Sequence, residues 1–292
     1  MEPSGWVTDL QTVTSKLSPE LAAGAAATAQ SAADRAGVEI RLLDSLAEFE
    51  AASRLIARIW SDDDPKAPAT LLRALSHAGN FVAGAVSESE LVGVSIGFFG
   101  RDGDGIHLHS HITGVDPRFQ NRSLGFALKQ FQRAWALANG ALSIRWTADP
   151  LVRRNLYFNL CKLGATVVDY YHDFYGPLLD GVNGAGESDR VLLHWELASP
   201  RAVAAADHPP LESSVRGAII VGPGSDGLPI AQPSGADTLL VWIPDDIVSL
   251  RSTGPGQAEA WREAVRVALS RALAEGYRGE AITRDGWLLL NR

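Results

Sequence analysis

From residue 38 to residue 198 the hydrophobic positions follow two spacings, one typical of strands and one of helices. Apolar positions in period-two or short continuous runs predict strands at 38–42, 81–86, 91–99, 106–115, 142–147, 165–171 and 190–197. Spacings of three and four predict helices at 45–60, 71–79, 123–139 and 151–163. The order β-α-α-β-β-β-α-β-α-β-β, with a hairpin through the polar turn 87–90, predicts an α/β fold with a mixed sheet flanked by helices.

The two ends of the chain differ from this central region. Residues 1–37 are rich in alanine and predict an N-terminal helical arm that packs on the main domain, with a frayed terminus as the alternative. Residues 199–215 contain prolines and alanines with few large apolar side chains, which indicates a linker. Residues 216–292 predict a small C-terminal α+β domain around a helix at 257–275. We therefore expect the main domain to be 38–198.

Charge and cysteine content exclude several function classes. The net charge of −8 over 292 residues opposes binding to nucleic acid or to an anionic membrane, since both need a basic face. The single cysteine, Cys161, has no second thiol for an internal disulfide or a thiolate metal site. We find neither a signal peptide nor a membrane span, and we expect a cytoplasmic protein.

The stretch 113–129 carries the clearest chemistry, because a strand, a polar turn and a helix follow one another there. The first turn of a helix has backbone N–H groups without intrahelical partners, and the helix dipole adds positive charge. Ser123 and Gly125 are small enough to let a phosphate approach these groups, and Arg118 and Arg122 could add charge. The alternative is an ordinary strand–turn–helix with a basic surface turn.

This stretch resembles the acetyl-CoA loop of the GNAT superfamily of acyltransferases, Gln/Arg-x-x-Gly-x-Gly/Ala. Gln120 to Gly125 match that pattern after the Val-x-Pro at 115–117, with Ser123 in place of the first glycine. The element order of 38–198 is also similar to that fold. Further segments resemble a little-characterised branch of predicted acyltransferases: 108–111, 146–151, 154–155, 158–159, 162–165, 175–176 and 189–190.

The resemblance implies a GNAT-like fold that binds acetyl-CoA or another acyl-CoA, without a metal. The pantetheine arm would lie between the strands ending at Val115 and Thr147, and the pyrophosphate on the N–H groups of 123–126. An acceptor amine would attack the thioester directly. The implied cofactor-binding residues are Thr113, Val115, Arg118, Gln120, Arg122, Ser123, Leu124, Gly125, Phe126, Asn155 and Asn159.

Candidates for acid–base chemistry come from the same region. His107, His109 and His111 alternate along one strand and should share a face, where an imidazole could accept the amine proton. We expect His109 or His111 to take a catalytic or substrate-binding role, and the alternatives are local hydrogen bonding or a metal. Asp149 is a third candidate, facing an ammonium, although Asp before Pro150 also suits a helix cap.

Acceptor recognition is expected from the loop between the last two strands of the main domain. Tyr175 or Arg190 could hold an acceptor carboxylate, and a surface ion pair is the alternative for Arg190. Many GNAT relatives have a tyrosine four residues before a closing glycine that protonates the leaving thiolate. Leu160 stands at that distance from Gly164, so this acid is missing.

Two functions are compatible with these features, and a third is disfavoured. The first is an acyl-CoA-dependent N-acyltransferase, with acetyl transfer to a small amine or amino acid favoured and N-succinylation of amino acids as the alternative. The second is a catalytically silent acyl-CoA-binding module. An unrelated nucleotide-binding domain is disfavoured, since no P-loop and no Gly-x-Gly-x-x-Gly opening a helix occurs. Exposed strand edges in the C-terminal unit would favour a homodimer.

Overall fold

A computed structural model describes residues 19–60, 67–103, 105–176, 187–207 and 216–292. They fall into two compact units. The first unit extends to Ile59, resumes up to Ile144 and includes Glu196–Ala198, whereas Arg145–Trp195 and Ser199–Arg292 form most of the second. Residues 1–18 of the predicted arm lie outside the described residues. Among the described helices, none has the length and apolar character needed to cross a membrane.

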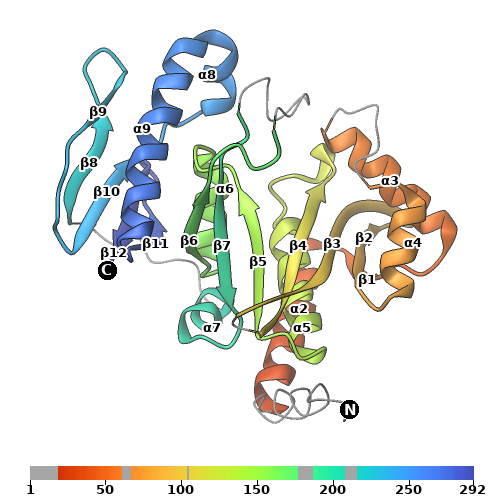
Figure 1. Ribbon diagram of the computed structural model, residues 1–292. Helices are drawn as coiled ribbons and strands as arrows, with labels where there is room; N and C mark the ends of the chain where they lie inside the picture. Colours follow the sequence, from red (N-terminus) through yellow and green to blue (C-terminus); the bar gives the residue numbers. More distant parts are fainter. Residues whose placement is uncertain (1–18, 61–66, 104, 177–186, 208–215) are drawn as a thin grey trace, which may run out of the picture. The chain divides into compact units, whose positions relative to one another are not determined.

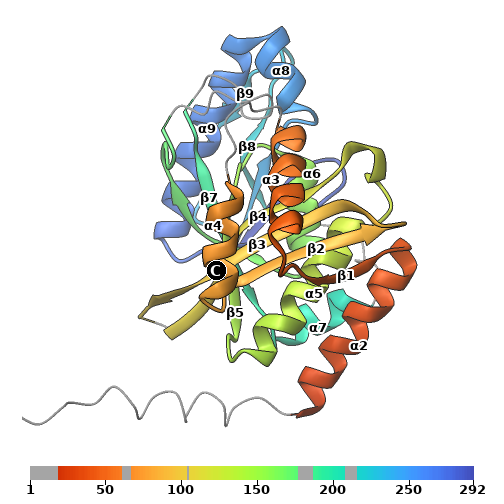
Figure 2. The ribbon, with the colours of Figure 1, turned by 90° about the vertical axis from the view of Figure 1, so that its right-hand side faces the viewer.

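The first unit contains four strands that lie side by side in chain order (Figure 1). Each pairs antiparallel with its neighbour. The strands are β1 (Glu39–Leu42), β2 (Phe81–Ser87), β3 (Glu90–Asp102) and β4 (Gly105–Val115). The helices are α2 (Pro19–Ala36), α3 (Leu46–Trp60), α4 (Ala69–His77) and α5 (Leu124–Ala138), with a 3₁₀ turn at Pro117–Phe119. Helix α5 packs on β2, β3 and β4, and α2 lies beside α5 (Figure 2).

Local sequence signals account for the turns and helix starts of this unit. The predicted capping box is confirmed, because Ser45 N donates to Glu48 Oε2 at 3.1 Å and Glu48 N donates to Ser45 Oγ at 3.3 Å. The β2–β3 hairpin turns through Glu88 and Ser89, which have φ values of 48° and 72°. Two consecutive left-handed residues match the twist of the flanking strands, so the turn also sets their register.

Packing of α5 on the sheet fixes where that helix begins. Leu124 and Leu128 form a buried cluster with Ala85 and Val92. A Cβ placed on Gly93 of β3 would lie 2.5 Å from Leu124 Cδ2, so this glycine allows α5 to approach the sheet closely. The first turn of α5 is thereby held directly beside the end of β4.

The second unit contains a mixed sheet with the order β5-β7-β6-β11-β12-β10-β8-β9. Its strands are β5 (Ser143–Ala148), β6 (Thr166–Tyr171), β7 (Arg190–Glu196), β8 (Ala218–Pro223), β9 (Pro229–Ala231), β10 (Thr238–Trp242), β11 (Arg278–Ile282) and β12 (Trp287–Asn291). Its helices are α6 (Arg153–Leu156), a π-helix at Tyr157–Lys162, α7 (Pro200–Asp207), α8 (Ile247–Thr253) and α9 (Pro255–Ala274). Strands β8 and β10 are parallel, and most other pairs are antiparallel. The predicted mixed α/β fold is confirmed.

Several elements differ from the sequence prediction. Helix α7 lies inside the segment predicted as a linker, where Ser199 Oγ accepts from Ala202 N and caps it. Ala202 and Ala206 are buried, so small side chains suffice for packing there. Strand β9 and helix α8 were not predicted. The boundaries of the two compact units differ from the predicted domain boundaries 38–198 and 216–292. The predicted domains therefore stay a prediction.

Candidate functional site

The turn after β4 is held to the sheet by Asp116. Its backbone N–H donates to Val92 O at 2.9 Å, and its carboxylate accepts from Arg118 N at 3.0 Å. Hydrogen bonding from the Arg118 side chain lowers the pKa of Asp116 to about 2. The carboxylate is therefore ionised at neutral pH and fixes the path of the chain toward α5.

The two arginines of this turn have different surroundings. Arg118 donates to Asp116 Oδ1 at 3.1 Å and to Oδ2 at 2.9 Å, and it also pairs with Glu90. The positive charge of Arg118 is thus paired with the carboxylates of Asp116 and Glu90. Arg122 lies over the ring of Phe119, with its guanidinium carbon 5.2 Å from the ring centre. Among the described residues Arg122 has no carboxylate partner, so of the two it is better placed to meet an anion.

The mouth of α5 is shaped by two left-handed residues. Asn121 and Ser123 have φ values of 64° and 60°, which is uncommon for residues other than glycine. Ser123 O accepts the first helical hydrogen bond, from Ala127 N at 3.0 Å. The N–H groups of 124–126 have no acceptor among the described residues. Gln120–Ser123 are exposed around them.

Space is available where a phosphate would approach these amides. A Cβ on Gly125 would meet only Val115 Cγ2, at an ordinary 3.9 Å. The sequence predicts that a phosphate approaches closely at Gly125, and this stays a prediction. Amides without an acceptor among the described residues, an uncrowded glycine and one available arginine suit a diphosphate group.

Strand β4, which leads to this mouth, has a β-bulge. Its pairing with β3 shifts between Ile112 and Ser110, which leaves His111 as the extra residue. Nearer the mouth, Thr113 Oγ1 lies 2.9 Å from Ser95 Oγ. Bulges re-aim side chains and free backbone groups from the ladder, and they are frequent next to functional sites.

The candidate histidines lie together on one face of β4, as their spacing predicts. The rings of His109 and His111 are 6.1 Å apart, and Phe98 contacts both. Burial, and then the neighbouring His111, His107 and Lys129, lower the pKa of His109 to about 4. Burial also lowers the pKa of His111. Neutral imidazoles can accept a proton, so the chemistry of a base is present there.

A buried polar network in the first unit was not predicted. Lys129 Nζ donates to Ser110 Oγ at 3.1 Å and to Gln132 Oε1 at 2.7 Å, and Gln132 donates to Ser95 Oγ at 3.3 Å. Burial lowers the pKa of Lys129 to about 7. Lys129 and Gln132 are three residues apart, which places them on one face of α5. That spacing was the available sequence signal.

In the second unit Asp149 follows β5 and is already paired. Its Oδ1 accepts from Leu151 N at 2.9 Å, which is the predicted turn into the next segment. Its Oδ2 accepts from Arg251 at 2.6 Å. Arg251 therefore already occupies the carboxylate that was predicted to bind an ammonium.

The helix after β5 differs from the predicted 151–163 helix, because the π-helix begins at Tyr157. Of the two predicted donor-binding asparagines, Asn155 is exposed and Asn159 is buried. The wider π turn changes the angular spacing of the residues that it contains, and such turns are frequent at functional sites. Leu160, at the position of the missing acid, is fully packed.

Tyr175 and Arg190, the predicted acceptor-binding residues, lie together. The Arg190 guanidinium carbon is 5.4 Å from the centre of the Tyr175 ring. The Tyr175 hydroxyl lies 3.2 Å from Thr147 Oγ1, near the end of β5. Tyr175 keeps 44% of its surface exposed, so a ligand can reach it.

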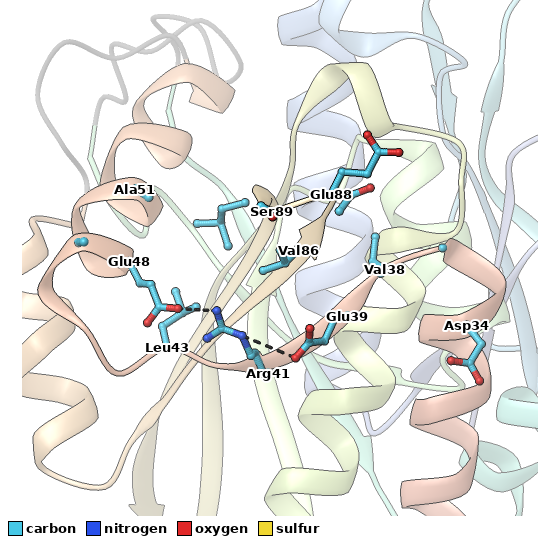
Figure 3. Close-up of a pocket in the computed structure, with 14 residues that line it drawn as sticks. Asp34, Val38, Glu39, Arg41, Leu43, Glu48, Ala51, Val86, Glu88 and Ser89 are labelled. Atoms are coloured by element: carbon cyan, nitrogen blue, oxygen red, sulfur yellow. Dashed lines mark ion pairs between the residues drawn. The ribbon is translucent and has the colours of Figure 1, made fainter.

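Two other places have side chains that could meet a ligand. His172, Glu187 and Asp189 are close enough to share a metal ion, but Arg266 donates to both carboxylates and already supplies a cation there. A groove of about 990 Å³ lies between the end of α2, β1 and the start of α3 (Figure 3). Arg41 inside it pairs with Glu48 at 2.6 Å and Glu39 at 3.7 Å. It contains none of the predicted site residues.

Comparisons with known proteins give structural likeness alone. No protein-family model matches the chain, and no curated protein matches it. Ard1 of Thermoplasma volcanium is 18% identical, with coverage of 54% of this chain and 96% of that one and a TM-score of 0.44. The ribosomal-protein-S18-alanine N-acetyltransferase of Escherichia coli is 14% identical, with coverage of 56% and 95% and a TM-score of 0.46. The GphF GNAT-like decarboxylase in complex with isobutyryl-CoA is 18% identical, with coverage of 55% and 99% and a TM-score of 0.43. Over about half its length, the chain is thus similar in fold to acetyltransferases, one of which is the acetyltransferase of GNAT family from Streptococcus pneumoniae.

Proposed function

We propose that the protein is an acyl-CoA-dependent N-acyltransferase of the GNAT type. Its donor is acetyl-CoA or another acyl-CoA, and its acceptor is a small amine or amino acid. The single observation that carries the proposal is the mouth of α5, where the Gln120–Gly125 motif brings together amides without an acceptor among the described residues, an uncrowded Gly125 and Arg122.

The first unit supplies the groups that would hold the donor. The N–H groups of 123–126 would bind the diphosphate, with Arg122 adding charge and Gln120 beside them. Backbone groups of Thr113 and Val115 would hold the extended arm in strand-like fashion. We assign Arg118 to positioning of the turn, because its guanidinium is engaged by Asp116 and Glu90.

The reaction needs little beyond positioning and one proton transfer. A thioester is an activated acyl donor with a good leaving group, so a neutral amine can attack it directly. His109 or His111 would accept the amine proton. Burial lowers the pKa of both imidazoles, so each is neutral near pH 7 and able to accept a proton, although it is a weaker base than a free imidazole. Asn155 and Asn159 remain candidates for donor contacts in the second unit, and Asp149 for the amine.

Gly125→Glu tests where the donor binds. A carboxylate at this position would occupy the approach path and repel a diphosphate. At about 4 Å and an effective dielectric constant of about 20 the repulsion is on the order of 4 kcal/mol. We expect calorimetry with coenzyme A to show at least a hundredfold weaker binding.

Two matched variants separate charge from bulk. Gly125→Gln has the same size as the glutamate without its charge, and Gly125→Ala adds only the Cβ for which there is room. The alanine variant should bind nearly as well as wild type and the glutamine variant should be intermediate. Unchanged affinity of Gly125→Glu, with an intact melting transition, would refute this placement of the donor.

A second candidate is an acyl-CoA-binding module without turnover, favoured by Leu160 at the position of the missing acid. Thiol release from acetyl-, propionyl- and succinyl-CoA with a panel of amines and amino acids separates the two functions. The same panel distinguishes acetyl from succinyl transfer. Donor binding without turnover across the panel would support the silent module.

A further inference from the structure

We propose that Arg266 of α9 is a positioning residue for Tyr175, and that the C-terminal segment thereby forms part of the acceptor side of the enzyme. The enzymatic consequence rests on the proposed function, whereas the positioning itself does not. The observation behind it is a continuous chain of hydrogen bonds within the second unit, from Arg266 to the backbone N–H of Tyr175.

The chain begins at Asp189, a carboxylate that is only 4% exposed. Arg266 binds it through two parallel bonds, Nε to Oδ2 at 2.8 Å and Nη2 to Oδ1 at 3.1 Å. The Tyr170 hydroxyl donates to the same carboxylate at 2.6 Å. Burial alone would raise the pKa of Asp189, but the bonds from Arg266 and Tyr170 lower it. The buried charge therefore depends on Arg266.

Asp189 organises the loop that carries Tyr175. Its Oδ1 accepts from Asp173 N at 3.1 Å, and the Asp173 carboxylate accepts from Ser188 N at 2.9 Å. Ser188 Oγ in turn accepts from Tyr175 N at 2.8 Å. The backbone of Asp173 and Tyr175 is thus tied to Ser188 and Asp189, and through Asp189 to α9.

Tyr175 then presents its hydroxyl beside Thr147, with Arg190 stacked on its ring. Two hydroxyl groups and a guanidinium are donors suited to a carboxylate. Within the proposed function, this identifies the acceptor as an amine that also carries a carboxylate, such as an amino acid. The position of the tyrosine ring then sets how well that carboxylate is held.

Helix α9, which carries Arg266, is held in place by its own packing. Trp261, Val265 and Leu269 of its inner face are buried, and Trp261 Nε1 donates to Gly227 O at 3.0 Å. Arg262 adds a second contact to the loop, with Glu187 O at 3.0 Å. The packing of α9 does not use the Arg266 guanidinium, so loss of Arg266 should release the loop and leave the helix in place.

Hydrogen exchange followed by mass spectrometry tests the positioning directly. Arg266→Met should speed exchange of the peptides covering 172–176 and 187–190 by about tenfold or more. In this variant the bonds between Arg266 and Asp189 are absent, so local opening of the loop costs less free energy. Arg266→Lys should be intermediate, since lysine keeps the charge without the planar fork. Arg271→Met is the matched control, because Arg271 lies on the same helix and, within the described part of the chain, its ion-pair partner is Glu275 at 2.8 Å. Unchanged exchange in Arg266→Met would overturn the proposal.

Kinetics test the consequence for the acceptor. With acetyl-CoA and the common amino acids as probes, Arg266→Met should raise the acceptor KM at least tenfold. Its calorimetric Kd for coenzyme A should stay within twofold of wild type. Faster exchange with an unchanged acceptor KM would overturn the acceptor role. Absence of coenzyme A binding or amino-acid turnover in wild type would instead refute the proposed function, and the exchange result would still decide the positioning.

Discussion

Replacing Lys129 by methionine removes an amine from the interior between α5 and β4. Lys129 is only 3% exposed, and burial lowers its pKa from 10.5 to about 7. Its amine lies within hydrogen-bond distance of Ser110 and Gln132. Methionine has a similar length and no charge, so the change isolates the ionisable group.

The sign of the pH effect follows from proton binding. The folded-state pKa is depressed, so between about pH 7 and 10.4 the unfolded chain binds more protons at this residue than the folded chain. The contribution of Lys129 to the stability of wild type therefore rises with pH in that window. The same contribution falls when the pH is lowered through it. From pH 7 to pH 9 the gain is about 2 kcal/mol at Lys129. The methionine variant lacks this contribution.

Urea denaturation at pH 7 and pH 9 measures the effect. The difference in unfolding free energy between Lys129→Met and wild type should shift by about 2 kcal/mol toward wild type at the higher pH. Other titrating groups are common to both proteins and cancel in the difference. Lys162→Met, at an exposed position, is the control and should show no such shift. A pH-independent difference for Lys129→Met would refute the assignment of a lowered pKa.

Two further predictions concern the proposed donor site and its histidines. Ser123→Gly should change stability by less than about 1 kcal/mol, because relief of the left-handed strain offsets the greater freedom of the unfolded glycine. Ser123→Val should lower the free energy of unfolding by about 2 kcal/mol or more, because a β-branched residue is strained at a φ of 60°. Urea denaturation in which both variants matched wild type would contradict this backbone conformation. The pKa of His109, about 4, predicts a neutral ring whose NMR signals stay constant from about pH 5 to pH 8. Because this folded pKa is depressed, stability should fall on acidification from about pH 6.5 to 4 in wild type and less so in His109→Phe; an NMR midpoint near 6.5 would contradict it.

Much of the fold could be predicted because its signals are local. The capping box of Ser45 and Glu48 and the polar turn at 87–90 depend on residues close in sequence, so the pattern alone identifies them. The α5 mouth belongs to the same class, since Gln120 to Gly125 are contiguous. The spacing of His109 and His111 likewise placed both on one face of β4.

The features that the sequence did not predict depend on contacts between residues far apart in the chain. Helix α7 forms in a segment poor in large apolar residues because Arg201 donates to Leu160 O at 2.9 Å and Gly164 O at 3.1 Å. The predicted charge of Arg118 is engaged by Asp116 and Glu90, and Glu90 lies 28 residues away. Sequence spacing carries no information on such partners.

By itself, the sequence determined the strand and helix order of 38–198 and the small-residue mouth after Pro117, because hydrophobic period and turn chemistry are written in neighbouring residues. Only the tertiary structure decided that β11 pairs with β6 and that Arg266 of α9 holds Asp189. Both are long-range contacts whose free energy arises when buried groups from separate segments find each other, so no local pattern specifies them.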